Sequence, residues 1–198
     1  MPLLDAMDKC DHARIPQHFG PGIRGYPMAR CDRCFSQGQI PRGNSIGASL
    51  WHLATHSDDR ERLVGDPRLI PTRVEEFLRA YTLVTVARDI VKGTEIDGCP
   101  VKQGEMVILA FGAGNRDPAI FPDADRVVVD RDVNRHAAFD PGIHRCIAST
   151  LARMEMRVAI EEGLAKFPEF FLTPGAVVEW SAGTVRGPRQ LPITFGAP

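Results

Sequence analysis

Regular hydrophobic spacing begins only at Asn44 in this chain of 198 residues. From there the spacing is that of one apolar helix face, with apolar residues at Ile46, Leu50, Leu53 and Ala54. The preceding residues are rich in glycine and proline and show no such period. We therefore expect an irregular leader over residues 1–43 and one folded region over residues 44–198, which has the size of a single domain.

The charge balance excludes several classes of partner. A formal net charge of −1 and a pI near 6.6 give no excess of basic residues that would favour nucleic acid or an anionic membrane surface. The longest apolar run, Met106 to Phe111, is too short to span a membrane. Five cysteines without regular spacing indicate a reducing compartment, so we expect a cytoplasmic protein that binds neither nucleic acid nor membrane.

The leader offers one alternative function. Thiolates and imidazoles at short spacing suit tetrahedral zinc, and the leader contains Cys10, His12, Cys31 and Cys34. The first pair has a non-standard spacing, so an irregular segment that happens to contain cysteine is the competing interpretation. The alternative hypothesis that the leader supports is therefore a non-enzymatic zinc-binding module.

The folded region mixes helical and strand patterns. We expect helices from Asn44 to about His56, from Thr72, whose T-x-x-E sequence is typical of a capping box, to Tyr81, and from Ile147 to Phe167. In the last helix the predicted buried side contains Ile147, Leu151, Met154, Val158 and Leu164. Glu76 and Arg79 lie opposite the apolar stripe of the second helix and could form a solvated ion pair.

Strand signals separate the second and third helices. We expect strands at Val84–Ala87, around a turn at Asp97-Gly98, at Met106–Phe111, and later at Val177–Trp180 and Leu191–Phe195. Residues 115–138 show neither period and predict a long ordered loop. The fold class is therefore α+β, mainly helical, with small antiparallel sheets.

Cys146 is the chemical centre of the sequence. At the first turn of the last predicted helix, unpaired N–H groups and the helix dipole would favour its thiolate. A phosphatase-type nucleophile would need H-C-x5-R, and His144 and Arg153 are out of that register. A buried structural cysteine and a haem iron ligand both remain open on these residues.

A family resemblance favours the haem ligand. The sequence FDPGIHRCIA, from Phe139 to Ala148, resembles the haem-binding loop of cytochromes P450, whose pattern is F-G-x-G-x-H/R-x-C-x-G. Asp140 and Ala148 replace two glycines of that pattern. Upstream, Glu76 and Arg79 resemble the family's E-x-x-R helix, and the sequence from Asn115 to Arg126 resembles the loop whose arginine completes a buried Glu-Arg-Arg network.

The resemblance implies a role for each matched residue. Cys146 would be the axial ligand of haem b, in a loop that begins at Phe139, and Arg88 and His144 would pair with the haem propionates. Glu76, Arg79 and Arg126 would form the structural network that supports the cysteine loop.

The resemblance covers about residues 44–195 and implies the C-terminal half of the family's fold, closest to soluble bacterial members. The acid–alcohol pair that delivers protons to oxygen in the family would fall on Ile40 and Pro41, which supply neither group. Because proline disrupts a helix interior, we expect the corresponding helix to begin after Pro41. We therefore expect a truncated, poorly active form, and the alternative is a non-enzymatic truncated haem-binding or zinc-binding module.

The implied activity is haem-thiolate monooxygenation, in which a small organic substrate, O2 and two electrons give a hydroxylated product and water. The implied electron donor is a ferredoxin-like protein with its reductase. A basic patch near the cysteine loop would steer an acidic donor, and its members would be Arg131, Arg135, His136, Arg145 and Arg153. The competing interpretation is a solvated loop in which Asp125, Asp130 and Asp132 neutralise these side chains.

Overall fold

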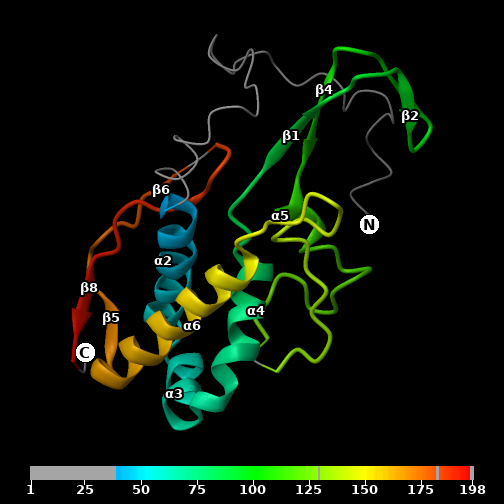
Figure 1. Ribbon diagram of the computed structural model, residues 1–198. Coiled ribbons are helices and arrows are strands. Elements are labelled where there is room, and N and C mark those ends of the chain that lie inside the picture. The colour runs from blue at the N-terminus through cyan, green and yellow to red at the C-terminus, as the bar shows by residue number, and fades with distance from the viewer. Residues whose placement is uncertain (1–38, 129, 182, 197–198) are drawn as a thin grey trace. The chain divides into compact units, whose positions relative to one another are not determined.

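The computed structural model describes residues 39–128, 130–181 and 183–196 (Figure 1). The chain divides into two compact units, which are described separately. In one unit the described residues are Val86–Leu109, and in the other they run from 39 to 85 and from 110 to 196. The four residues of the zinc hypothesis, Cys10, His12, Cys31 and Cys34, lie outside the described residues.

Three helices build the core of the larger unit. They are α2 (Gln39–Thr55), α4 (Ile70–Ala80) and α6 (Ser149–Lys166), and α6 packs against both others. Their apolar faces meet in one cluster that includes Leu53, Val74, Phe77, Met156 and Ile160. Burial of these side chains supplies the main favourable term in folding.

Helix α2 begins earlier than the sequence predicts. It starts at Gln39 and contains Ile40 and Pro41, so the expectation of a start after Pro41 is wrong. Proline is tolerated here because the N–H groups of the first helical turn have no acceptor within the helix. The missing N–H of Pro41 therefore removes no helical hydrogen bond.

A buried hydrogen-bond network joins α2 to the next two helices. His52 of α2 is 2% exposed; its Nε2 contacts Asp59 of α3 (Ser57–Gly65) at 2.7 Å and its Nδ1 contacts the Tyr81 hydroxyl at 2.7 Å. Burial lowers the pKa of His52 to about 4, although the Asp59 hydrogen bond opposes this shift. The neutral ring therefore donates to Asp59 and accepts from Tyr81.

The start of α4 also differs from the prediction. A short 3-10 helix, η2 (Pro67–Leu69), leads directly into α4, which begins at Ile70 with proline in its first turn and no side-chain cap. Thr72 therefore lies inside the helix, and the predicted capping box does not form. Glu75, its predicted partner, pairs with Arg153 instead.

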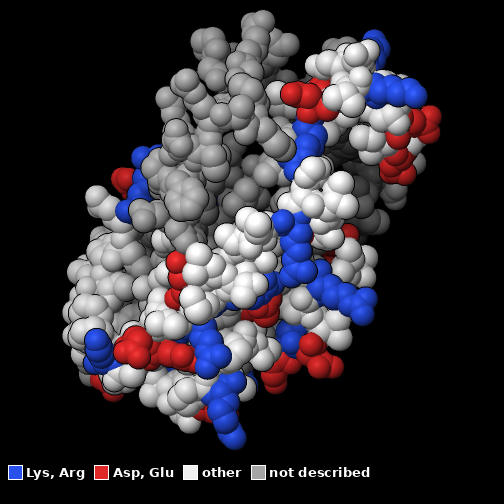
Figure 2. Space-filling view, viewed as in Figure 1, with Lys and Arg blue, Asp and Glu red and all other residues white. Residues whose placement is uncertain are grey.

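Helix α6 is apolar on two opposite sides. The buried side contains Met156, Ile160 and Leu164. Of the predicted buried residues only Leu164 is buried, and Ile147, Leu151, Met154 and Val158 are 101%, 41%, 55% and 50% exposed. At 100° per residue the two sets lie about half a turn apart, so spacing alone could not choose between them. Figure 2 shows uncharged side chains over much of α6.

Short antiparallel pairs complete the fold. In the smaller unit β1 (Val86–Asp89) pairs with β4 (Met106–Leu109), and β2 (Thr94–Ile96) pairs with β3 (Cys99–Val101). Positive φ angles at Asp97 and Gly98 form the predicted tight turn. In the larger unit β5 (Phe170–Leu172) pairs with β8 (Ile193–Phe195), and β6 (Trp180–Ser181) pairs with β7 (Gly187–Pro188).

A long loop connects the short helix α5 (Phe111–Gly114) to α6. Its described residues, 115–128 and 130–148, form turns and bends without helix or strand, as the sequence predicts for residues 115–138. Among the residues the structure describes, no helix is both long enough and apolar enough to cross a membrane.

Candidate functional site

The cysteine loop is a closed turn fixed by its own backbone. The Cys146 N–H donates to the Phe139 carbonyl at 2.9 Å and thereby joins the two ends of the loop. Asp140 adopts a φ of 64°, and its carboxylate accepts from the Gly142 N–H at 3.0 Å. Aspartate tolerates this left-handed conformation because its side chain can bond locally, so the replaced glycine is accommodated.

The thiol of Cys146 is free and exposed. This excludes the buried structural cysteine. Helix α6 begins at Ser149, whose N–H donates to the Cys146 carbonyl at 3.1 Å, so the cysteine precedes the helix and does not lie in its first turn. Ile143 and Ile147, on either side of it, are 97% and 101% exposed. The Cys146 thiol is a soft metal ligand and lies between exposed apolar side chains. This arrangement suits a metal ion that is held in a flat, apolar cofactor.

The predicted propionate partners lie in different units. His144 is exposed on the cysteine loop of the larger unit. Arg88 is exposed on β1 of the smaller unit, where its Nη1 donates to the Ala87 carbonyl at 3.0 Å. Each residue is exposed, and the pairing of both with one ligand stays a prediction.

Glu76 and Arg79 form a buried bidentate ion pair instead of a solvated one. Both side chains are 0% exposed, and Arg79 donates from Nε and Nη2 to the two carboxylate oxygens, each at 2.8 Å. The remaining Arg79 N–H groups donate to the carbonyls of Asn115, Ala124 and Arg126 at 2.7–2.8 Å. All five donors of this guanidinium are therefore satisfied, as a buried charge requires.

The second arginine of the network is Arg131, and the prediction of Arg126 is wrong. Arg131 Nε donates to Glu76 Oε2 at 3.0 Å. Arg126 is exposed and contributes only its carbonyl, because a turn begun at Asp123, with a φ of 52°, directs the Arg126 backbone toward Arg79. The carboxylate also accepts from the Val128 N–H and the Asn134 amide.

These contacts favour the ionised carboxylate. Burial by itself raises the pKa of Glu76, but the hydrogen bonds from Arg79 and Val128 and the charges of Arg79 and Arg131 outweigh it. The net effect is a pKa below the ordinary value.

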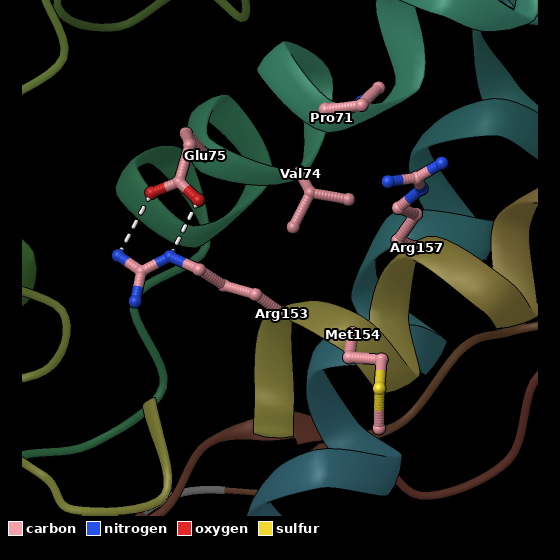
Figure 3. A pocket seen from close by; sticks show the side chains of 6 residues that line it. All are labelled: Pro71, Val74, Glu75, Arg153, Met154 and Arg157. Atoms are coloured by element: carbon pink, nitrogen blue, oxygen red, sulfur yellow. Dashed lines mark hydrogen bonds and ion pairs between the residues drawn. The ribbon is translucent and has the colours of Figure 1, made fainter. Parts of the chain in front are cut away.

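Glu75, the neighbour of Glu76 on α4, holds a second cluster (Figure 3). Its two oxygens accept from Arg153 Nε and Nη2 at 2.6 and 2.9 Å, and Oε2 also contacts His136 Nε2 at 3.0 Å. This ion pair forms one wall of an open pocket of about 270 Å³ between α4 and α6. The pocket is lined by Pro71, Val74, Glu75, Arg153, Met154 and Arg157.

Most members of the predicted basic patch form ion pairs within the chain. Arg131 pairs with Glu76, while His136 and Arg153 pair with Glu75, so three of its five members do not present free charge. Arg135 and Arg145 are exposed. For these three side chains the partners are glutamates of α4 and not the predicted Asp125, Asp130 and Asp132.

Sequence reasoning missed Glu75, Asn134 and the pairing of Arg131. One signal was available, since Glu75 and Glu76 are adjacent charges on a helix whose other face is apolar. Their partners come from the long loop and from α6, and no local spacing indicates such distant contacts.

The free loop cysteine and the buried Glu-Arg-Arg network are both features that the cytochrome P450 resemblance implies. Comparison of the sequence with protein families supports this, because the family described as Cytochrome P450 matches residues 55–179. The chain belongs to the cytochrome P450 family.

Two relatives are named as hydroxylases. The chain is 40% identical over 155 residues to a mycinamicin IV hydroxylase/epoxidase of Micromonospora griseorubida, covering 76% of this chain and 39% of the relative. It is 40% identical over 157 residues to a vitamin D(3) 25-hydroxylase of Pseudonocardia autotrophica, covering 77% and 39%. The chain thus spans about 40% of the length of the relatives it matches.

Solved structures agree with the family assignment. The crystal structure of cytochrome P450 CYP101C1 superposes with a TM-score of 0.80 at 34% identity, covering 89% of this chain and 47% of that chain. A structure of the mixed-function P450 MycG gives a TM-score of 0.72 at 38% identity, covering 77% and 40%. The α+β fold class is confirmed.

Proposed function

We propose that the chain holds haem b through the Cys146 thiolate and takes part in monooxygenation of a small organic substrate. The observation that carries the proposal is the free, exposed thiol on a hydrogen-bonded loop between two exposed isoleucines. The bound haem would supply the oxygen-activating chemistry that no side chain of this chain can provide.

The chain's own residues would bind and orient the cofactor. The loop closed by the Cys146 N–H would hold the sulfur outward, and Ile143 and Ile147 would cover apolar surface of the ring. Arg88 and His144 would bind the propionates, and Phe139 would contribute to the cofactor site. The buried Glu76, Arg79 and Arg131 would fix the part of the long loop that leads to the cysteine loop.

The experiment that tests the ligand uses the full chain and its two described cysteines. Carbon monoxide spectra of the reduced, haem-loaded protein should show the thiolate-type Soret band in the wild type and in Cys99→Ser. Cys146→Ser should lose it, because a hydroxyl at its normal pKa cannot replace a soft anionic donor. A thiolate-type band that persists in Cys146→Ser would refute the assignment.

For electron delivery we propose a ferredoxin-like donor with its reductase, in the cytoplasm. Exposed Arg135 and Arg145 are the parts of the predicted patch that could steer an acidic donor. Electron transfer should slow as ionic strength rises and on Arg145→Glu, whereas Arg131→Lys should not alter the salt dependence. An unchanged rate in Arg145→Glu would exclude this docking role.

The proton supply is the remaining part of the proposal. Ile40 and Pro41 have no acid or hydroxyl where the family's relay pair would fall. We therefore expect this chain alone to spend most delivered electrons on oxygen reduction without product. The ratio of product to electrons consumed measures this, and a ratio near one would contradict it.

A further inference from the structure

The geometry points to Glu75, His136 and Arg153 as positioning residues that hold Cys146 in place. This inference rests on the proposed function, because Cys146 matters as a positioned ligand only if it binds the haem iron. It adds a second charged cluster to the Glu76 network, with different partners and a different target. We call these three residues the Glu75 cluster.

The Glu75 cluster is built around one carboxylate. Glu75 accepts a bidentate pair of hydrogen bonds from Arg153 of α6, and its Oε2 also accepts from His136. His136 is 2% exposed, and its Nδ1 accepts from the Ala138 N–H at 3.2 Å, so the proton lies on Nε2. Burial raises the pKa of Glu75, but the hydrogen bonds from His136 and Arg153 outweigh this and lower it to about 2. The carboxylate therefore stays ionised at neutral pH.

Arg153 connects this carboxylate to the cysteine loop. Its guanidinium lies over the ring of Phe139, with the Cζ atom 4.7 Å from the ring centroid. The carbonyl of Phe139 accepts the Cys146 N–H, which closes the loop. The path from α4 to the cysteine thus has three direct contacts: an ion pair, a cation–π contact and a hydrogen bond.

The Glu76 carboxylate does not itself make this connection, and Arg79 of its network reaches the same segment only through Asn115, whose carbonyl accepts from Arg79 and whose side chain accepts from the Ala137 N–H. The groups that donate to the Glu76 carboxylate belong to Arg79, Val128, Arg131 and Asn134, all before the cysteine loop in the chain. The two adjacent carboxylates of α4 therefore hold different parts of the long loop. Glu76 holds the part up to Asn134, and Glu75 holds the part from His136 to Phe139.

Substitution of Arg153 tests the inference with a matched control on the same helix. Arg153→Lys keeps the charge but loses the bidentate and stacked geometry. Arg157→Lys alters the exposed pair with Glu161 one turn later, which does not touch the cysteine loop. In the full haem-free chain we expect amide hydrogen exchange at Cys146 to be about tenfold faster in Arg153→Lys, the effect of losing one charge-assisted contact. Arg157→Lys should match the wild type.

A second amide separates positioning from general stability. Ile160 is 0% exposed in the core, so its amide reports opening of the whole unit. Acceleration at Cys146 with unchanged exchange at Ile160 supports positioning. Equal acceleration at both amides, or no acceleration at Cys146, overturns it. Should Arg153→Lys fail to fold, Glu75→Gln provides the same comparison.

The route through Phe139 is tested by a double substitution. In a Phe139→Leu background the ring is absent, so Arg153→Lys should change Cys146 exchange by less than about twofold. A persistent tenfold effect would overturn the inference.

The haem-loaded protein gives an independent readout. Arg153→Lys should increase the fraction of carbon monoxide complex with a thiol-type band, and Arg157→Lys should not. If the wild type lacks the thiolate-type band, the proposed function fails while the exchange measurements still decide the role of the Glu75 cluster. If the wild type has that band and Arg153→Lys leaves both spectrum and exchange unchanged, only the inference fails.

Discussion

Glu76 Oε2 accepts a hydrogen bond from Arg131 Nε at 3.0 Å across 55 positions of sequence. The carboxylate is 0% exposed and is the charge partner of both Arg79 and Arg131. Glu76→Ala would leave two largely buried guanidiniums without a counter-charge, at a cost of about 3–5 kcal/mol in the free energy of unfolding.

Denaturant unfolding of the full chain measures this cost. Glu161→Ala is the matched control, because it removes a glutamate whose partner, Arg157, is 56% exposed, and it should change stability by less than about 1 kcal/mol. Similar unfolding of Glu76→Ala and the wild type would show that Glu76 is effectively solvated.

Stability should fall as the pH decreases from 6.5 to 4. The pKa of His52 is about 4 in the folded chain, whereas the ordinary value of a histidine is 6.5, so the unfolded chain binds more protons in this window. The contribution is complete above pH 6.5 and decreases by roughly 3 kcal/mol toward pH 4.

Unfolding free energies across this pH range check the prediction for His52. His52→Gln should flatten the dependence of the unfolding free energy on pH. His144→Gln, which replaces an exposed residue of the cysteine loop, should retain it. A second loss is expected as the pH falls from 4.5 to 2, because the pKa of Glu75 is lowered to about 2. Stability that stays constant from pH 6.5 to 4 would exclude a neutral buried His52.

The two faces of α6 should respond differently to truncation. Ile160 is 0% exposed, and Ile160→Ala should cost about 2–5 kcal/mol because it leaves a cavity in the core. Val158 is 50% exposed, and Val158→Ala should cost less than about 1 kcal/mol. Thermal or denaturant unfolding compares the two variants, and equal costs would contradict the assigned orientation of the helix.

Substitution by alanine should change the stability of the chain in opposite directions at two glycines. Gly187 has a φ of 156°, and a Cβ there would collide with the side chain of Asn44 on α2. Gly187→Ala should therefore destabilise the chain by about 1–3 kcal/mol. Gly163 lies inside α6 with open space around it, and Gly163→Ala should stabilise by about 0.5–1 kcal/mol. A neutral Gly187→Ala would mean that β7 can move away from α2.

The sequence was informative wherever a local pattern decides the structure. The apolar spacing around Phe77 predicts α4, and the Asp97-Gly98 pair predicts the turn between β2 and β3. The loop over residues 115–138 was also predictable, since neither period is present. The family resemblance of FDPGIHRCIA then indicated which cysteine to examine.

The remaining features depend on contacts between distant parts of the chain. Helix α3 has little apolar spacing and is held by buried Leu63 and by Arg60, which donates to the Leu53 carbonyl of α2. Arg131 and not Arg126 pairs with Glu76, because a turn exposes the Arg126 side chain while the Arg131 side chain is buried. The buried side of α6 could not be chosen because both of its faces are apolar.

Glu75 and Glu76 are adjacent on one helix, and this has a consequence for proteolysis. The loop between α5 and α6 has no regular structure in its described part, and such segments are the usual sites of cleavage. Here, however, its backbone and side chains bind to two carboxylates carried by the same rigid turn of α4. A protease could bind either part of this loop in extended form only after that part separates from its carboxylate, so the segment with the least secondary structure should be cut nearly as slowly as the helices around it.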